Sequence, residues 1–281
     1  MELTAEKVHE RLTPRWNAHF FEQVDSTNEI AMENLRRNRS FIQAQNAEDV
    51  IVADEQVKGK GRLGRTWYTP PGTALIVSVI LPIIEPKFLP RVTMLGVVAI
   101  AEMIDGLSKH PLPPALSPLH GEGDQEKHPA VGIKWPNDVQ VNGKKVSGVL
   151  SEACWKINEP YAPLLAGVVL GMGVNVRIDF SGTELEETAI SIEPALSKTV
   201  DRLELLGDLM ARVDYWYARI GSDALFDAWK RRLNMLGKMV TVQQATIYGL
   251  AESVDEDGTL MVRDEQNVLH RVVAGDIALG S

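Results

Sequence analysis

Residues 58–67 read KGKGRLGRTW and place three glycines among four basic side chains. Gly59, Gly61 and Gly64 have the spacing of a dinucleotide-binding turn, and the stretch is one substitution from a phosphate-binding loop, with Arg65 where that motif has Lys. Both motifs need a helix directly after the glycines, because the helix N-terminus faces the phosphates. A tryptophan, a Pro-Pro-Gly turn and an apolar run follow instead, so neither motif applies.

The stretch still has the chemistry of a cationic, glycine-rich loop. Glycine lets a backbone rearrange and approach a ligand closely, and the guanidinium groups of Arg62 and Arg65 can each hold two oxygens of a phosphate or carboxylate. Because like charges this close repel one another, we expect the loop to be loose alone and to order over an anionic ligand, as active-site lids do. A solvated basic turn is the alternative.

Further basic residues lie in a predicted hairpin. Two extended runs, residues 131–141 and 144–153, flank Asn142 and Gly143, the dipeptide that best tolerates a type I′ turn. The hairpin places Lys145 across the turn from the strand that carries Lys134, so two more cations are available to an anion.

Hydrophobic periodicity predicts the elements that must position these groups. The order of the predicted helices and strands along the chain indicates an α+β fold with a mixed, largely antiparallel sheet and packed helices. Short strands of a small barrel-like domain follow after Gly237. The predicted helices cover residues 4–12 and 201–220 and start at Ser26, at Met94 and after Ser222; the predicted strands cover residues 50–53, 74–81, 131–141 and 144–153 and start at Leu164.

Composition excludes several classes of protein. The 281 residues are 44% apolar and 24% charged, as in ordinary globular proteins, and no apolar run is long enough to span a bilayer. The polar N-terminus does not resemble a targeting segment, so a cytoplasmic location is predicted. Cys154 is the single cysteine, which excludes an internal disulfide, and it is interpreted as a buried thiol. A net charge of −9 disfavours non-specific nucleic-acid binding.

Residues 109–130 contain four closely spaced prolines and show no periodicity, so an exposed loop without chemistry is expected. His110, His120 and His128 in this stretch lack zinc-ligand spacing. They are interpreted as solvated loop residues.

Five ordered segments resemble the biotin protein ligases. They are DSTNE at 25–29, DEQVKGKGRLGRTW at 54–67, IKWPNDV at 133–139, KKVSGVLSE at 144–152 and GMGVNV at 171–176. VVAGDI at 272–277 is similar to the C-terminal domain of that family. The resemblance implies a class II synthetase-like catalytic domain over residues 1–235 and an SH3-like β-barrel over residues 236–281.

The resemblance also implies a reaction in two steps. Biotin is activated with ATP and Mg²⁺ to biotinyl-AMP with release of pyrophosphate, and biotin is then transferred to a lysine of a biotin carboxyl carrier protein. The implied catalytic residues are Lys134, Arg62, Lys145 and Asp138. Those implied for biotin are Ser26, Thr27, Asn28, Gln56, Lys60, Gly61, Arg62, Lys134, Gly148, Gly171 and Gly173; those implied for the nucleotide are Arg65, Trp67, Asn137 and Asn175.

Several of these roles have alternatives. Ser26 can also cap the helix that it begins, Lys145 can be a solvated hairpin charge, and Asp138 can orient a lysine or hold a magnesium-bound water. No protein site for a metal is predicted beyond Mg²⁺ carried by ATP. The glycines are interpreted as places where a flat ligand lies against the sheet. Lys60 stands where the family usually has Arg, which replaces a bidentate contact by a point charge.

Two other functions compete with this interpretation. A lipoate or octanoate protein ligase or transferase has the same fold, and a non-catalytic nucleotide- or acyl-binding module would use the same cations without activating a substrate. Because 24 residues precede Asp25, no DNA-binding domain is expected. No membrane partner is expected either, and a homodimer through an exposed sheet edge is kept open.

Overall fold

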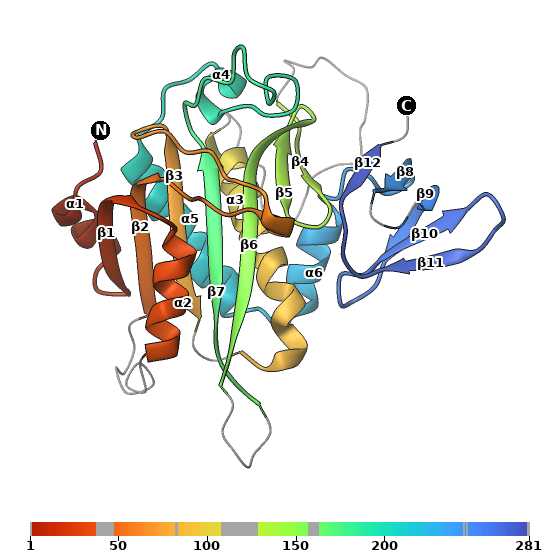
Figure 1. Ribbon diagram of the computed structural model, residues 1–281, viewed down its shortest axis with the longest axis horizontal. Coiled ribbons are helices and arrows are strands. Elements are labelled where there is room, and N and C mark those ends of the chain that lie inside the picture. Colours follow the sequence, from red (N-terminus) through yellow and green to blue (C-terminus); the bar gives the residue numbers. More distant parts are fainter. Residues whose placement is uncertain are drawn as a thin grey trace.

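The computed structural model describes residues 2–37, 48–81, 84–107, 129–156, 163–243, 245 and 247–279. Its body is a seven-stranded sheet in the order β1-β2-β3-β7-β6-β5-β4 (Figure 1). β1 and β2 run parallel and the other neighbours run antiparallel, which confirms the predicted α+β fold. The strands are β1 (Trp16–Val24), β2 (Glu48–Gln56), β3 (Ala74–Leu81), β4 (Val131–Lys134), β5 (Asp138–Val141), β6 (Lys144–Lys156) and β7 (Leu164–Asn175).

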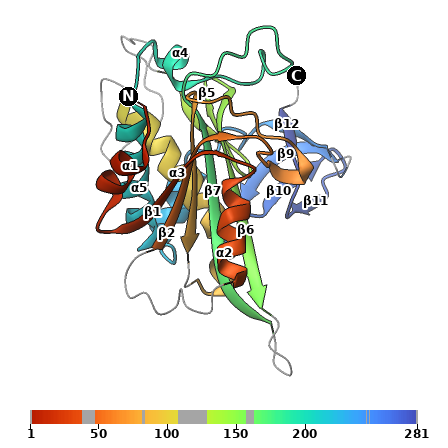
Figure 2. The same ribbon diagram turned by 60° about the vertical axis from the view of Figure 1, so that its left-hand side comes forward.

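Helices cover both faces of this sheet. α2 packs on one face, and α1, α3 and α5 lie on the other (Figure 2). α3 begins five residues before the predicted start at Met94, because Pro90 lies in its first turn, where a missing N–H costs nothing. The helices are α1 (Ala5–Leu12), α2 (Thr27–Arg37), α3 (Leu89–Leu107), α4 (Ile192–Leu196), α5 (Arg202–Tyr217) and α6 (Asp223–Lys230), with 3₁₀ turns η2 (Arg62–Gly64) and η3 (Pro86–Phe88).

Burial explains which strands could be predicted. All eight residues of β3, ALIVSVIL, are buried, as expected for a strand covered on both faces. β1 has the sequence WNAHFFEQV and lies at the edge of the sheet. Trp16, Ala18 and Phe20 alternate with Asn17 and His19, and Phe21, Glu22 and Gln23 then interrupt the period-two pattern that marks a strand. The sequence analysis did not predict β1.

The run at 131–141 is not one strand, as predicted, but two. β4 and β5 pair antiparallel around a turn at Trp135, Pro136 and Asn137, and the register sets Lys134 opposite Asp138. Proline has no N–H for a strand ladder, so the extended run ends there; the Trp135–Pro136 peptide is cis. The next turn is the predicted one, since Asn142 and Gly143 have φ of 51° and 82°.

Short strands after α6 form a second sheet, in the order β11-β10-β9-β8-β12, which confirms the predicted small β domain. These strands are β8 (Met239–Val242), β9 (Ile247–Val254), β10 (Leu260–Asp264), β11 (Leu269–Val272) and β12 (Ile277–Leu279). Val240 and Ala251 belong to the same buried cluster as Leu95 of α3 and Trp229 of α6. The two sheets therefore share a continuous core, and the division at residues 235 and 236 stays a prediction.

Most of the loop expected at 109–130, with its three histidines, lies outside the described residues. Cys154 is buried, as interpreted from the sequence. Among the helices that the structure describes, none has the length and apolarity needed to cross a membrane.

Trp135 joins the two sheets and provides a test of their packing. It is 2% exposed, and its indole N–H donates a hydrogen bond to the Gly258 carbonyl at 2.8 Å. Trp135→Phe is expected to lower the free energy of unfolding by about 1–2 kcal/mol, because the partly buried Gly258 carbonyl loses its donor. Urea denaturation measures the loss. Trp155→Phe, at a side chain that is 46% exposed, is the control; equal midpoints for the two variants would contradict the assigned contact.

Candidate active site

One cavity of about 480 Å³ collects the residues predicted from the sequence. Every residue implied for catalysis, biotin binding or nucleotide binding lines it. The walls come from the start of α2, the end of β2, the glycine-rich loop at 57–73, the β4–β5–β6 hairpins and β7. Residues 180–189, which the sequence analysis assigned to no element, add an outer wall.

A buried polar network forms one end of the cavity. The backbone N–H and hydroxyl of Thr27 donate to Gln56 Oε1 at 2.8 and 3.0 Å. Ser78 Oγ lies 2.7 Å from Asn28 Oδ1 and 2.8 Å from Thr27 Oγ1, and Asn28 Nδ2 donates to Glu152 Oε2 at 2.7 Å. Thr27, Asn28 and Ser78 are buried, so the network is preorganised. Ser78 and Glu152 were not predicted.

The three glycines predicted in the sheet make room for side chains of the chain itself. A Cβ atom at Gly171 would clash with Asn28, and one at Gly173 would lie 2.6 Å from the Trp67 ring. A Cβ atom at Gly148 would be 3.2 Å from the same ring. The indole of Trp67 therefore lies against β6 and β7 at these glycines. The expected occupant of this place was a flat ligand in direct contact with the sheet.

Trp67 is placed there by the fold of the glycine-rich loop. Its N–H donates to the Gly59 carbonyl at 2.8 Å, and Gly61 N–H donates to the Arg65 carbonyl at 2.8 Å, so the loop folds back on itself. Leu63 and Gly64 have φ of 57° and 75° at its tip. The indole Nε1 of Trp67 is buried and has no hydrogen-bond partner among the described residues.

The basic side chains of the loop are paired with carboxylates. Lys58 Nζ lies 2.8 Å from Asp25 Oδ2, and Lys60 forms an ion pair with Glu29. Both acids lie at or next to the start of α2, so the pairs connect the loop to the segment that carries the polar network. These carboxylates offset the like-charge repulsion on which the predicted loose loop was based. That the loop orders over an anionic ligand stays a prediction.

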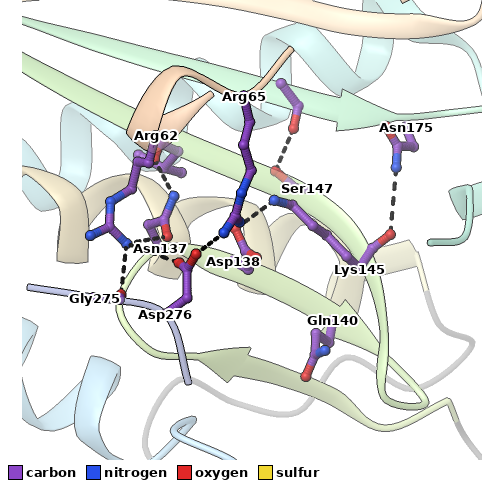
Figure 3. Close-up of polar contacts among 12 residues, drawn as sticks. Arg62, Arg65, Asn137, Asp138, Gln140, Lys145, Ser147, Asn175, Gly275 and Asp276 are labelled. Carbon is purple, nitrogen blue, oxygen red and sulfur yellow. Dashed lines mark hydrogen bonds and ion pairs between the residues drawn. The ribbon is translucent and has the colours of Figure 1, made fainter. Parts of the chain in front are cut away.

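The C-terminal domain supplies the carboxylate that pairs with both arginines (Figure 3). Arg65 forms an ion pair with Asp276, and Arg62 Nη1 lies 4.0 Å from the same carboxylate. Arg62 Nη1 also donates to Asn137 Oδ1 at 3.0 Å and to the Gly275 carbonyl at 3.5 Å. Asp276 was not predicted as a site residue, because nothing in the sequence links positions so far apart.

Two lysines and one carboxylate lie at the other side of the cavity. Lys145 Nζ is 2.8 Å from Asp138 Oδ1 and 5.3 Å from the centroid of the Trp67 ring. It faces the cavity, unlike a solvated hairpin charge. Burial lowers the pKa of Lys134, opposed by Asp138 and reinforced by Lys145 and Arg65. Burial likewise lowers the pKa of Arg62. The cavity lining contains more cations than carboxylates, so the region favours a polyanion. The cations are Lys60, Arg62, Arg65, Lys134 and Lys145, and the carboxylates are Asp138, Glu187 and Asp276.

Asn175 holds the outer wall of the cavity. Its Nδ2 donates to the Ile190 carbonyl at 3.2 Å, and Lys145 N–H donates to the Thr188 carbonyl at 2.8 Å. These bonds fix residues 188–190 beside the start of β6. Within the described part of the chain, no group of three or more His, Cys, Asp and Glu side chains could hold a metal ion.

The cavity thus places uncharged polar side chains beside a group of cations against a mixed sheet. Residues 20–175 match the Biotin/lipoate A/B protein ligase family, and residues 235–280 match the Biotin protein ligase C terminal domain. The first match covers more than half of the chain. The chain belongs to the biotin/lipoate A/B protein ligase family.

Curated relatives and solved structures agree with the family. The Bifunctional ligase/repressor BirA of Bacillus spizizenii is 27% identical over 82% of this chain and 66% of its own length, so the chain spans just under two thirds of that protein. The biotin–[acetyl-CoA-carboxylase] ligase of Paracoccus denitrificans is 29% identical over 76% of this chain and 83% of its own. The Aquifex aeolicus biotin protein ligase with biotin and ATP has a TM-score of 0.67 at 24% identity, covering 94% and 98% of the two chains, and shares the fold.

Gly173→Ala tests the packing of Trp67. The new methyl would overlap the indole ring, so Trp67 is expected to leave the sheet at a cost of about 1–3 kcal/mol. Its exposure should shift the tryptophan emission to the red and speed acrylamide quenching. Gly106→Ala in α3 is the control, because the nearest atom is the mobile end of Arg212, 3.2 Å away. Unchanged emission in Gly173→Ala would show that Trp67 does not depend on this glycine.

Proposed function

We propose that this chain is an ATP-dependent biotin protein ligase. The observation that carries the proposal is the arrangement of the cavity. A neutral network of Thr27, Asn28 and Gln56, with Glu152 accepting a hydrogen bond from Asn28, lies beside a cluster of four cations. That pattern suits a ligand with a neutral, hydrogen-bonding head and a carboxylate that must meet a polyphosphate. The family match, including the biotin-specific C-terminal domain, supports biotin over lipoate or octanoate.

The neutral network is the proposed site of the biotin ureido group. A ureido group offers one acceptor and two donors, and Ser26, Thr27, Asn28 and Gln56 offer both kinds of partner. Thr27 and Gln56 already hold each other at 2.8 Å, so little ordering is needed when a ligand replaces that bond. Backbone groups at Lys60 and Gly61 would close the same pocket.

In the first step, an oxygen of the biotin carboxylate attacks the α-phosphorus of ATP, and the bond to the leaving pyrophosphate breaks. Two anions must approach each other, so fixed positive charge is the main requirement. We assign this charge to Lys134, Arg62 and Lys145. Arg65, Asn137 and Asn175 are the proposed nucleotide contacts, and Trp67 supplies a flat apolar surface.

In the second step, an acceptor lysine amine attacks the biotinyl carbonyl, an amide forms and AMP leaves. The relatives named biotin–[acetyl-CoA-carboxylase] ligases indicate a biotin carboxyl carrier protein as the acceptor. Asp138 is placed 2.8 Å from Lys145, where it can orient that ammonium for either step. A non-catalytic binding module would not need this paired arrangement.

Mg²⁺ belongs to this proposal as a companion of ATP. The donor set fits a weakly held ion, because Asp138 and Asn137 offer oxygens while no larger acidic cluster lines the cavity in the described residues. Mg²⁺ is commonly bound by one or two carboxylates plus substrate phosphates, and it would neutralise phosphate charge there. The homodimer, the cytoplasmic location and the absence of DNA binding stay predictions.

Pyrophosphate exchange into ATP tests the function. Exchange should depend on biotin and be absent with lipoate or octanoate, because only biotin carries a ureido group for the neutral network. Lys134→Ala should reduce biotin-dependent exchange by about 10²-fold or more while the protein stays folded. Lys87→Ala, at an exposed lysine paired with Glu85, is the matched control. Exchange that needs lipoate, or no exchange with any acid, would overturn the proposal.

The pH dependence of exchange gives a second test of Lys134. Its lowered pKa means that the ammonium loses its proton at a lower pH than an ordinary lysine. Exchange should therefore fall on the alkaline side before ordinary lysines titrate. Lys134→Arg keeps a charge at all accessible pH values, so its alkaline fall should move to higher pH even where its maximum rate is lower. Identical alkaline limbs for the two proteins would remove Lys134 from this role.

A further inference from the structure

A partly buried ion pair lies next to the glycine-rich loop and outside the cavity. Arg202, the first residue of α5, donates from Nη1 to Asp54 Oδ1 at 2.6 Å, and its side chain is 3% exposed. The same Nη1 donates to the Ala74 carbonyl at 3.1 Å, at the start of β3. Asp54 lies in β2, two residues before Gln56. The pair therefore fixes one carboxylate between the two strands that the loop connects.

The second oxygen of Asp54 holds the far end of the loop. Asp54 Oδ2 accepts the N–H of Gly72 at 3.0 Å, and Arg177 Nη1 donates to the Gly72 carbonyl at 3.1 Å. Gly72 has φ of +74°, a conformation that suits glycine. Arg177 is itself held by Glu193, at 2.7 Å. Both peptide groups of Gly72 are thus fixed by charged side chains.

The near end of the loop is attached differently. The N–H groups of Val57 and Lys58 donate to the carbonyls of Val24 and Asp25 at 2.9 and 3.0 Å. Gly72 lies five residues after Trp67. A segment this short limits how far Trp67 can move once Gly72 is fixed. The position of Gly72 therefore limits where the Trp67 ring can lie on Gly148 and Gly173.

We infer that Asp54 is a positioning residue for nucleotide binding, an inference that rests on the proposed function. By fixing Gly72, Asp54 holds Trp67, Arg62 and Arg65 in place over the cavity without lining the cavity itself. The biotin pocket does not involve Gly72, so the effect concerns ATP more than biotin. A structural role alone would lower stability and leave both Michaelis constants unchanged.

Asp54→Asn tests the inference. The amide keeps the size of the side chain but cannot accept from Arg202 and from Gly72 with two oxygens, so the loop end is released. We expect the KM for ATP to rise about tenfold or more, the KM for biotin to change much less, and trypsin to cleave within residues 58–65 faster. Steady-state exchange and timed proteolysis measure these quantities in the full chain.

Asp105→Asn is the matched control. Asp105 Oδ2 lies 2.7 Å from Arg232 Nη2 in another partly buried ion pair, and neither residue contacts the loop. This variant should lose stability with unchanged KM for ATP and unchanged cleavage at 58–65. An equal KM rise in Asp105→Asn, or no change of KM in a folded Asp54→Asn, would overturn the inference.

A second variant and a measurement that needs no activity complete the test. If Asp54→Asn does not fold, Arg177→Gln removes the other charged contact to Gly72 and should give the same rise in the KM for ATP; an unchanged KM would contradict the inference. Proteolysis needs no activity, so it separates the two hypotheses. If the unaltered chain shows no biotin-dependent exchange, the proposed function fails, whereas faster cleavage in Asp54→Asn alone would still show that Asp54 holds the loop.

Discussion

Positive charge gathered in one partly buried cavity is the constraint on which this structure depends. Arg62, Arg65, Lys134 and Lys145 all line the cavity, and bringing them together would cost free energy if nothing opposed the repulsion. Carboxylates next to these cations offset the repulsion. Asp138 lies beside Lys145, and Asp276 reaches the two arginines from the C-terminal domain.

These carboxylates come from separate parts of the chain, which explains why the architecture needs two packed sheets. The turn between β4 and β5 sets Lys134 opposite Asp138, and the C-terminal sheet shares a core with α3 and α6 so that Asp276 can reach the loop. α2 contributes acids on the remaining side, near Lys58 and Lys60. The charge arrangement is thus a property of tertiary packing and not of any one motif.

Local patterns in the sequence predicted much of the fold. They could not predict contacts between residues that are distant in the sequence. The Asn142-Gly143 turn and the all-apolar β3 are determined by neighbouring residues, and both were predicted. The division of 131–141 into two strands was missed although Pro136 gave a local reason for it. Ser78 and Asp276 were missed because each becomes part of the site only through packing. The carboxylate partners of the loop cations were missed for the same reason, since the cations are adjacent in the sequence and their partners are distant.

Every cation of the glycine-rich loop is paired with a carboxylate of the same chain, so an anionic ligand must displace these ion pairs when it binds. An anion with a single charge would exchange one ion pair for another of similar strength and gain little. A ligand with several charges on one phosphate chain can replace several pairs at once, and it gains from being multivalent. The acids beside the loop thus compete with dissolved anions for the loop cations. This competition favours ligands that carry several negative charges over those that carry one.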